Sequence, residues 1–194
     1  MAVQTVFQRY EMKYLLTQAQ REAVLRALEP HMALDPYGRT VIRNLYLDTE
    51  SYRLIRRSIE KPVYKEKMRI RCYGPAHPDS PVFVELKKKY KKVVYKRRLS
   101  LPEREAMDWV LGRRACPAGT QISEEVDYFL RYYAPLRPVA FLSYAREAYF
   151  AKDGSDFRVT FDDTILCRQD DLSLESAYQT LIYPNLQKEA VRYA

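Results

Sequence analysis

Between residues 61 and 100, polar and apolar side chains alternate with a period of two. Successive side chains of a β-strand point to opposite faces, so this spacing predicts strands with one polar and one apolar face. Segments 74–81 and 90–92 interrupt the pattern, which predicts three consecutive antiparallel strands. The expected polar face carries Lys65, Lys67, Arg69 and Arg71 from the first strand, Glu85, Lys87 and Lys89 from the second, and Lys96 and Arg98 from the third.

The same alternation predicts four more strands, and a different spacing predicts helices between them. Thr17 with Gln20 three positions later is a capping-box signature, and apolar side chains follow it at helical spacing. The expected strands are 3–15, 41–48, 138–150 and 157–162, and the expected helices are a segment after Thr17, 49–59, 102–111 and a segment from near residue 123. We therefore expect an α+β protein, built on a mostly antiparallel β-barrel or tunnel with inserted helices.

The composition is that of one folded domain with anionic partners. The chain has 194 residues, of which 47% are hydrophobic and 13% aromatic, enough for a substantial core. A formal net charge of +8 favours nucleic acid, nucleotides, polyphosphate or an acidic membrane surface as partners. Three widely spaced cysteines without a CxxC pair argue for a reducing compartment and against a zinc site. We expect a cytoplasmic protein unless a membrane-protein partner tethers it.

The positive charge is concentrated in the alternating segment. Residues 61–98 contain 13 of the 33 Lys and Arg residues and only three acids. Like charges on neighbouring strands repel, so such a face is unfavourable unless an anion covers it. The alternative interpretation is the solvated face of an antiparallel sheet. If the sheet curls, its cations point into one water-filled lumen, which suits a highly charged linear anion.

Acidic side chains on the same strand faces are candidate metal ligands. Glu11, between Arg9 and Lys13 on the first strand, and Glu85 are the foremost of these, and Asp48 and Asp162 are further candidates. Carboxylate oxygens suit Mg²⁺ or Mn²⁺ that bridges phosphates. Phosphoryl transfer requires little beyond positioned phosphates, charge neutralisation and an in-line nucleophile. The sequence contains no P-loop, no GxGxxG and no kinase signature.

Seven stretches together resemble the VTC domain, the polyphosphate-polymerase module of the vacuolar transporter chaperone family and of stand-alone bacterial proteins. In order they are RYEMKYLL, NLYLDTE, MRIRCYG, VFVELKKK, VYKRRLSL, LRPVAFLSYAREAYF and FRVTFDDTI, and the resemblance runs from about residue 7 to 172. VTC domains belong to the CYTH-like triphosphate tunnel metalloenzymes. The resemblance implies a tunnel fold, ATP and polyphosphate as ligands, transfer of the terminal phosphate of ATP to polyphosphate, and assistance by Mn²⁺ or Mg²⁺.

The resemblance also implies roles for individual cations. Those matched to catalytic positions are Lys13, Arg69, Arg71, Lys87 and Lys96, and those matched to nucleotide- or phosphate-binding positions are Arg146 and Arg158. The strand faces add Arg9, Lys67 and Arg98 as phosphate-binding candidates. We expect these side chains to line one tunnel.

The end of the chain departs from the family pattern. The family continues with an acidic strand of the form LMEIK, whose glutamate is a metal ligand, whereas this chain continues as LSLESAYQTLIYPNLQKEAVRYA. We expect a tunnel domain at 1–172 and a tail at 173–194, with the acidic strand missing or the barrel completed differently. The late acids, Glu189 among them, show no convincing strand pattern.

Three alternatives to a polymerase remain open. They are a triphosphatase on the same scaffold, a non-catalytic domain that binds polyphosphate or nucleotide, and a nucleic-acid-binding module. The last is disfavoured, because the cations accompany no RRM-like aromatic motif and Tyr95 falls on the opposite strand face.

Overall fold

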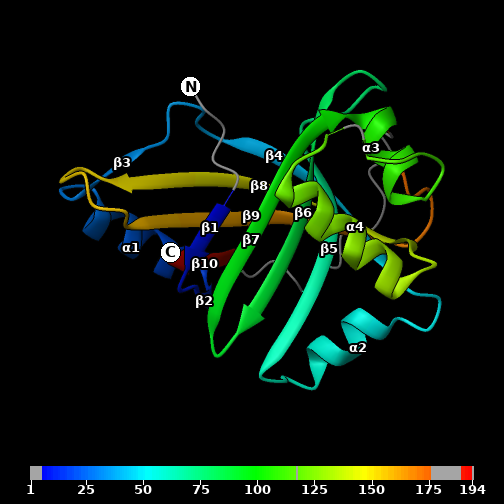
Figure 1. Ribbon diagram of the computed structural model, residues 1–194. Coiled ribbons are helices and arrows are strands. Elements are labelled where there is room, and N and C mark those ends of the chain that lie inside the picture. The colour runs from blue at the N-terminus through cyan, green and yellow to red at the C-terminus, as the bar shows by residue number, and fades with distance from the viewer. Residues whose placement is uncertain (1–5, 117, 176–188, 194) are drawn as a thin grey trace.

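Ten antiparallel strands form one curled sheet in the computed structural model, which describes residues 6–116, 118–175 and 189–193 (Figure 1). The strands are β1 (Val6–Arg9), β2 (Met12–Leu16), β3 (Met32–Leu34), β4 (Thr40–Asp48), β5 (Tyr64–Tyr73), β6 (Pro81–Tyr90), β7 (Val93–Pro102), β8 (Arg137–Ala151), β9 (Arg158–Arg168) and β10 (Glu189–Tyr193). The helices of the described residues are α1 (Gln18–Leu28), α2 (Arg53–Ile59), α3 (Glu103–Val110) and α4 (Gln121–Tyr133). The expected α+β class with an antiparallel sheet is confirmed.

The two edge strands of the sheet are consecutive in the sequence, so the chain between them connects the two edges. The order is β1-β7-β6-β5-β4-β8-β9-β10-β2, and β3 pairs with β8. Only Tyr10 and Glu11 separate the edge strands β1 and β2. The N-terminal segment therefore pairs with β7 through its first part and with β10 through its second. This connection requires the sheet to curl around a lumen.

Helices α3 and α4 cover the outer face of the sheet formed by β5, β6 and β7 (Figure 1). The apolar positions of these strands and the facing stripes of the helices form the main core, as their spacing predicts. This core includes Met68, Ile70, Val84, Leu86, Leu99, Trp109, Val126 and Phe129. Because the apolar faces of the three strands are turned toward the helices, their polar faces are turned toward the lumen.

Helix α1 begins as the sequence predicts. The Thr17 hydroxyl accepts a hydrogen bond from the Gln20 backbone, and the Gln20 side chain accepts one from the Thr17 backbone at 2.8 Å. These two contacts satisfy amide groups that a helix N-terminus leaves without partners. A smaller core of Met32, Val159 and Phe161 packs against this helix.

Three expectations about strands need correction. The segment 3–15 contains two strands, which Tyr10 and Glu11 divide, and β3 was not expected. The absence of a strand from the tail is also wrong for 189–193, because β10 lies between β9 and β2 with Glu189 as its first residue. A short segment between two partner strands obtains backbone hydrogen bonds on both sides, so it forms a strand without a strong pattern of its own.

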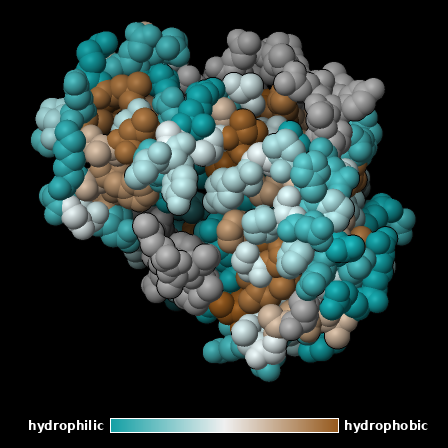
Figure 2. Space-filling view, turned by 90° about the horizontal axis from the view of Figure 1, so that it is seen from above, coloured by the Kyte–Doolittle hydropathy of each residue, from teal (hydrophilic) through white to brown (hydrophobic). Residues whose placement is uncertain are grey.

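The surface of the molecule is mixed in character. Figure 2 shows hydrophilic and apolar residues interspersed over two lobes with a furrow between them. The longest helix of the described residues, α4, has 13 residues. No helix within this part of the chain has both the length and the apolar character needed to cross a membrane.

Candidate functional site

The curled sheet encloses a cavity of about 720 Å³ that is lined by cations from five strands. This volume lies in the range of small-molecule sites. The lining cations are Arg69 and Arg71 of β5, Lys87 of β6, Lys96 and Arg98 of β7, Arg146 of β8 and Arg158 of β9. Two carboxylates, Glu11 and Asp35, also line it. The cavity therefore brings together seven of the ten predicted cations.

The strand register explains why the cations of β5, β6 and β7 face the same way. Residues directly opposite each other on paired strands share a face. One row across the three strands is Arg69, Glu85 and Arg98. The next row is Lys67, Lys87 and Lys96. The alternation in the sequence thus produces two adjacent rows that contain five cations and one acid.

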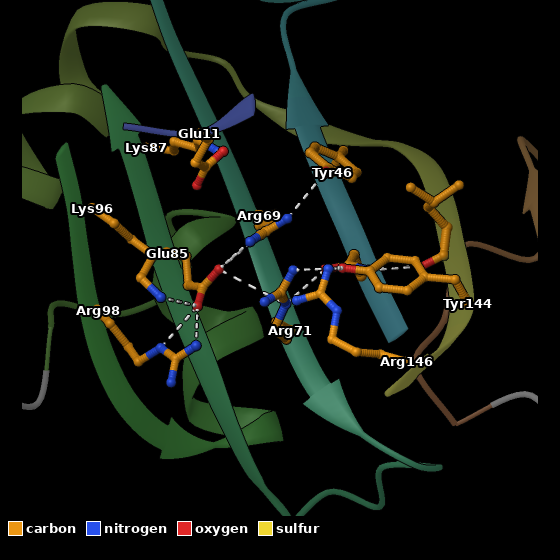
Figure 3. A network of polar contacts seen from close by, with 12 residues as sticks. Glu11, Tyr46, Arg69, Arg71, Glu85, Lys87, Lys96, Arg98, Tyr144 and Arg146 are labelled. Carbon is orange, nitrogen blue, oxygen red and sulfur yellow. Dashed lines mark hydrogen bonds and ion pairs between the residues drawn. The ribbon is translucent and has the colours of Figure 1, made fainter. Parts of the chain in front are cut away.

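Glu85 is the shared counterion of this cation cluster (Figure 3). Its side chain is 1% exposed, and both of its oxygens are engaged. Arg69 Nε donates to one oxygen at 2.8 Å and Arg98 Nε donates to the other at 2.8 Å. Arg71 and Lys96 lie at 3.8 and 3.7 Å from the carboxylate. Burial alone would raise the pKa of Glu85, but these four cations outweigh it and hold the pKa well below its usual value.

Arg71 lies deepest in the cluster and is held mainly by neutral groups. Its Nε donates to Asn44 of β4 at 2.9 Å, and its second amino nitrogen donates to the Tyr144 hydroxyl of β8 at 3.0 Å. Burial, followed by the charge of Arg69, lowers the pKa of Arg71. Four cations thus share one carboxylate among the described residues, which gives this wall an excess of positive charge that favours an anion.

Two groups of the cluster, Lys96 and the neighbouring Tyr46, have pKa values near neutrality. Burial lowers the pKa of Lys96 to about 7, with Glu85 opposing this shift and the neighbouring arginines adding to it. Burial would raise the pKa of Tyr46, but the charge and hydrogen bond of Arg69 lower it to about 8. The Tyr46 hydroxyl accepts that bond at 3.1 Å. The cluster therefore contains groups that exchange protons near physiological pH.

The opposite wall, from β8 and β9, carries its own acids. Arg146 donates to both oxygens of Asp162, at 2.6 and 2.8 Å. Figure 3 shows Arg146 and Arg71 converging on the Tyr144 hydroxyl from two strands. Arg158 lies 4.0 Å from Asp35. The cations of this wall are each compensated by a neighbouring carboxylate.

The predicted metal ligands do not come together as expected. No group of three or more acidic, histidine or cysteine side chains suited to a metal occurs in the described part of the chain. Both oxygens of Glu85 are bound by arginines, Asp162 is bound by Arg146, and Asp48 accepts backbone amides at the start of α2. These three therefore do not fit a metal. Glu11 remains a candidate ligand, since it lines the cavity, where it pairs with Lys87 at 2.8 Å.

Two of the predicted cations do not line the cavity, and the structure does not describe the side chain of a third. Lys13 is exposed on β2, opposite Arg192 of β10. Lys67 belongs to the second row and is half-buried, but it is outside the cavity lining. Arg9 lies on β1 opposite Val94, and its side chain is outside what the structure describes. Their roles remain those that the resemblance and the strand faces predict.

Three neutral residues of the cluster were not predicted from the sequence. Asn44, Tyr46 and Tyr144 hold the two β5 arginines from β4 and β8. A signal was present, because Asn44 and Tyr46 alternate on one face of the predicted strand 41–48. Neutral side chains at these positions do not stand out until the pairing of β4 with β5 and β8 places them beside the arginines.

Solved structures with a similar fold include two that are described as candidate cyclases. One is a candidate adenylate cyclase from Bacillus halodurans, with a TM-score of 0.61 and 15% identity over 98% of this chain and 81% of that one. The other is a candidate adenylyl cyclase from Hippeastrum, described as having a dominant triphosphatase activity, with a TM-score of 0.55 and 14% identity over 98% and 79%. These similarities show that the chain shares the fold of these two proteins.

Comparison at the level of sequence gives the family. No curated protein is detectably similar in sequence to this chain. The sequence model of the VTC domain matches residues 8–192, which include the strands that form the cation cluster and extend into β10. The chain therefore belongs to the VTC domain family.

Proposed function

We propose that this chain is an ATP:polyphosphate phosphotransferase that adds the terminal phosphate of ATP to a polyphosphate chain inside the cavity. The observation that carries the proposal is the cluster around Glu85, where four cations share one carboxylate. An excess of buried positive charge favours a ligand with several adjacent negative charges. Membership in the VTC family and the tunnel fold support a domain that handles triphosphates.

In the proposed reaction, a terminal oxygen of polyphosphate attacks the γ-phosphorus of ATP. A new P–O bond forms to the chain, the bond to the β-phosphate breaks, and ADP leaves. The negative charge of the transferred group and of the leaving oxygen is stabilised by fixed cations, which is the main catalytic demand of phosphoryl transfer. Arg69, Arg98 and Lys96 are the proposed donors on one side of the phosphates, with Lys87 at the Glu11 end. Mn²⁺ or Mg²⁺, held by phosphate oxygens and Glu11, would add charge neutralisation.

A triphosphatase is the second candidate, because the Hippeastrum neighbour is described with this activity. Water would then replace polyphosphate as the nucleophile and inorganic phosphate would be released. The cations that bind the triphosphate are the same in both reactions, so the acceptor distinguishes them.

The test incubates the chain with ATP, a short polyphosphate primer and Mn²⁺, and follows chain length and free phosphate together. Chain growth with little free phosphate is expected, and addition of EDTA should reduce it. Lys87→Ala should lower the rate at least about tenfold, because Lys87 lines the cavity.

Lys88→Ala is the matched control. Lys88 is the next residue on β6, but it points to the outer face and pairs with Glu125 of α4. This variant should retain the wild-type rate. Release of free phosphate without chain growth would favour the triphosphatase, and neither product in any condition would contradict both enzymes.

A further inference from the structure

One end of the cavity carries aromatic side chains, although seven cations also line the cavity. Tyr73 and Phe83 line this end together with Pro75 and Pro81. Tyr73 follows Arg71 by two positions on β5, and Phe83 precedes Glu85 by two positions on β6. Both rings therefore share the face that carries the cations: Phe83 lies directly opposite Arg71, and Tyr73 lies about 7 Å beyond Arg71 along β5. Phosphate groups form no favourable contacts with apolar rings. The aromatic surface therefore suits a ligand that has a planar ring besides its phosphates.

The two rings form a corner. Their centroids lie 5.9 Å apart and their planes are inclined at 80°. The guanidinium of Arg98, which binds Glu85, lies 4.3 Å from the centroid of the Phe83 ring. Tyr73 is 50% exposed although it lines the cavity. A flat ligand can therefore contact the rings while its charged part reaches Arg98.

We propose that the Tyr73–Phe83 corner binds the base of a nucleoside triphosphate whose phosphates lie along the cation rows. This inference rests on the proposed function and assigns the cavity a direction. Nucleobases stack on aromatic rings and on guanidinium planes, and the two prolines exclude water from the same surface. Lys87 lies four positions from Phe83 along β6, about 13 Å for an extended strand. The base end is thus at Phe83, and the terminal phosphate points toward Lys87 and Glu11.

Stacking contacts the face of a nucleobase and does not involve the polar groups on its edge. We therefore expect little selection between adenine and guanine nucleotides, because the proposed contacts with the base are made by the faces of aromatic rings. The corner should favour a nucleotide over an inorganic polyphosphate of the same charge, because the polyphosphate has no base. It would hold the phosphate donor in one orientation, so that the acceptor chain enters from the Lys87 end.

The test compares calorimetric titrations of ATP and inorganic tripolyphosphate into the wild type, Tyr73→Ala and Phe83→Leu. Loss of one stacking contact should weaken ATP binding about tenfold in either variant. The affinity for tripolyphosphate should change less than about twofold, since this ligand has no base. Phe83→Leu keeps an apolar side chain beside Arg98, and thermal unfolding of each variant verifies that the fold is retained.

Tyr90→Ala serves as the control, because Tyr90 is a half-exposed tyrosine at the other end of β6 and does not line the cavity. It should bind both ligands as the wild type does. Equal losses for ATP and tripolyphosphate would overturn the base subsite and leave the rings as supports for Arg98. Unchanged ATP binding would also overturn it, while the proposed function would stand.

A larger loss for a single-stranded RNA oligonucleotide than for ATP would assign the corner to nucleic acid instead. Failure of the wild type to bind either phosphate ligand would overturn the proposed function itself, and the inference with it.

Discussion

The two walls of the cavity carry their positive charge in opposite ways. On the wall formed by β5, β6 and β7, four cations share Glu85. On the wall formed by β8 and β9, Arg146 has Asp162 and Arg158 lies near Asp35. The same pairing continues outside the cavity, where Arg39 binds Asp163 and Arg21 binds Glu147.

We infer from this difference that the compensation of the cations, more than their number, determines which wall binds an anion. An arginine that already has a bidentate carboxylate must give up part of that interaction before it binds a phosphate. A cluster in which several cations share one carboxylate gains charge compensation when an anion arrives. We therefore expect the first wall to supply most of the phosphate affinity and the second to shape the cavity.

The largest expected effect is on stability, from the shared carboxylate. Glu85→Gln leaves the four cations of the first wall without their counterion, so the free energy of unfolding should fall by about 3–5 kcal/mol. Urea denaturation measures this change. Tripolyphosphate should restore part of the lost stability, because it replaces the missing negative charge.

Glu125→Gln is the control for this loss. Glu125 also receives two cations, Lys88 and Arg97, but on the more exposed outer face of the sheet. Its change should be within about 1 kcal/mol and should not respond to tripolyphosphate. Equal losses for the two variants would remove the distinction between the cluster and an ordinary ion pair.

The second expected effect is on affinity and compares the walls directly. Arg98→Ala removes a charged donor from the first wall and should weaken tripolyphosphate binding by about 10- to 100-fold. Arg158→Ala, on the second wall, should weaken it by less than about fivefold, and Arg97→Ala, on the opposite face of β7, should leave it unchanged. Titration calorimetry at one ionic strength gives all three values. A larger loss for Arg158→Ala would reverse the assignment of the walls.

The smallest expected effect is a pH dependence that belongs to the first wall. The pKa of Lys96 is lowered from 10.5 to about 7, so its charged form is disfavoured in the folded protein. This penalty is fully present below about pH 7 and is relieved as pH rises toward 10.5. Without ligand, the contribution of Lys96 to the free energy of unfolding should therefore become more favourable as the pH rises from about 7 to 10.5.

Anion binding should show the opposite trend, because it requires the charged form of Lys96. Above pH 7, tripolyphosphate affinity should fall by at most about tenfold per pH unit. Lys96→Arg keeps its charge across this range, so its affinity profile should be flatter than that of the wild type. Tripolyphosphate itself titrates in this range, but equally for both proteins. The ratio of the wild-type affinity to the Lys96→Arg affinity at each pH therefore cancels this effect. A constant ratio from pH 6 to 9 would show that Lys96 does not titrate in this range.

Much of the site follows from local patterns in the sequence. The alternation over 61–100 identified the lumen-facing cations Arg69, Arg71, Lys87, Lys96 and Arg98. The Thr17–Gln20 signature located the start of α1. The VTC resemblance indicated the family, which the match to residues 8–192 shows. A period of two and a capping box are local properties, so they can be recognised without knowing which segments meet.

The tertiary structure decided which charges compensate each other. Glu85 was expected to hold a metal, but the register of β5, β6 and β7 places it between Arg69 and Arg98. Tyr46, Asn44 and Tyr144 gained roles only through the pairing of β4 with its two neighbours, and β10 formed because β9 and β2 flank it. The sequence by itself determined the faces of the strands and their positive charge. Which acid lies beside which base depends on contacts between strands that are distant in sequence, so only the folded sheet determined which cations retain an excess of charge.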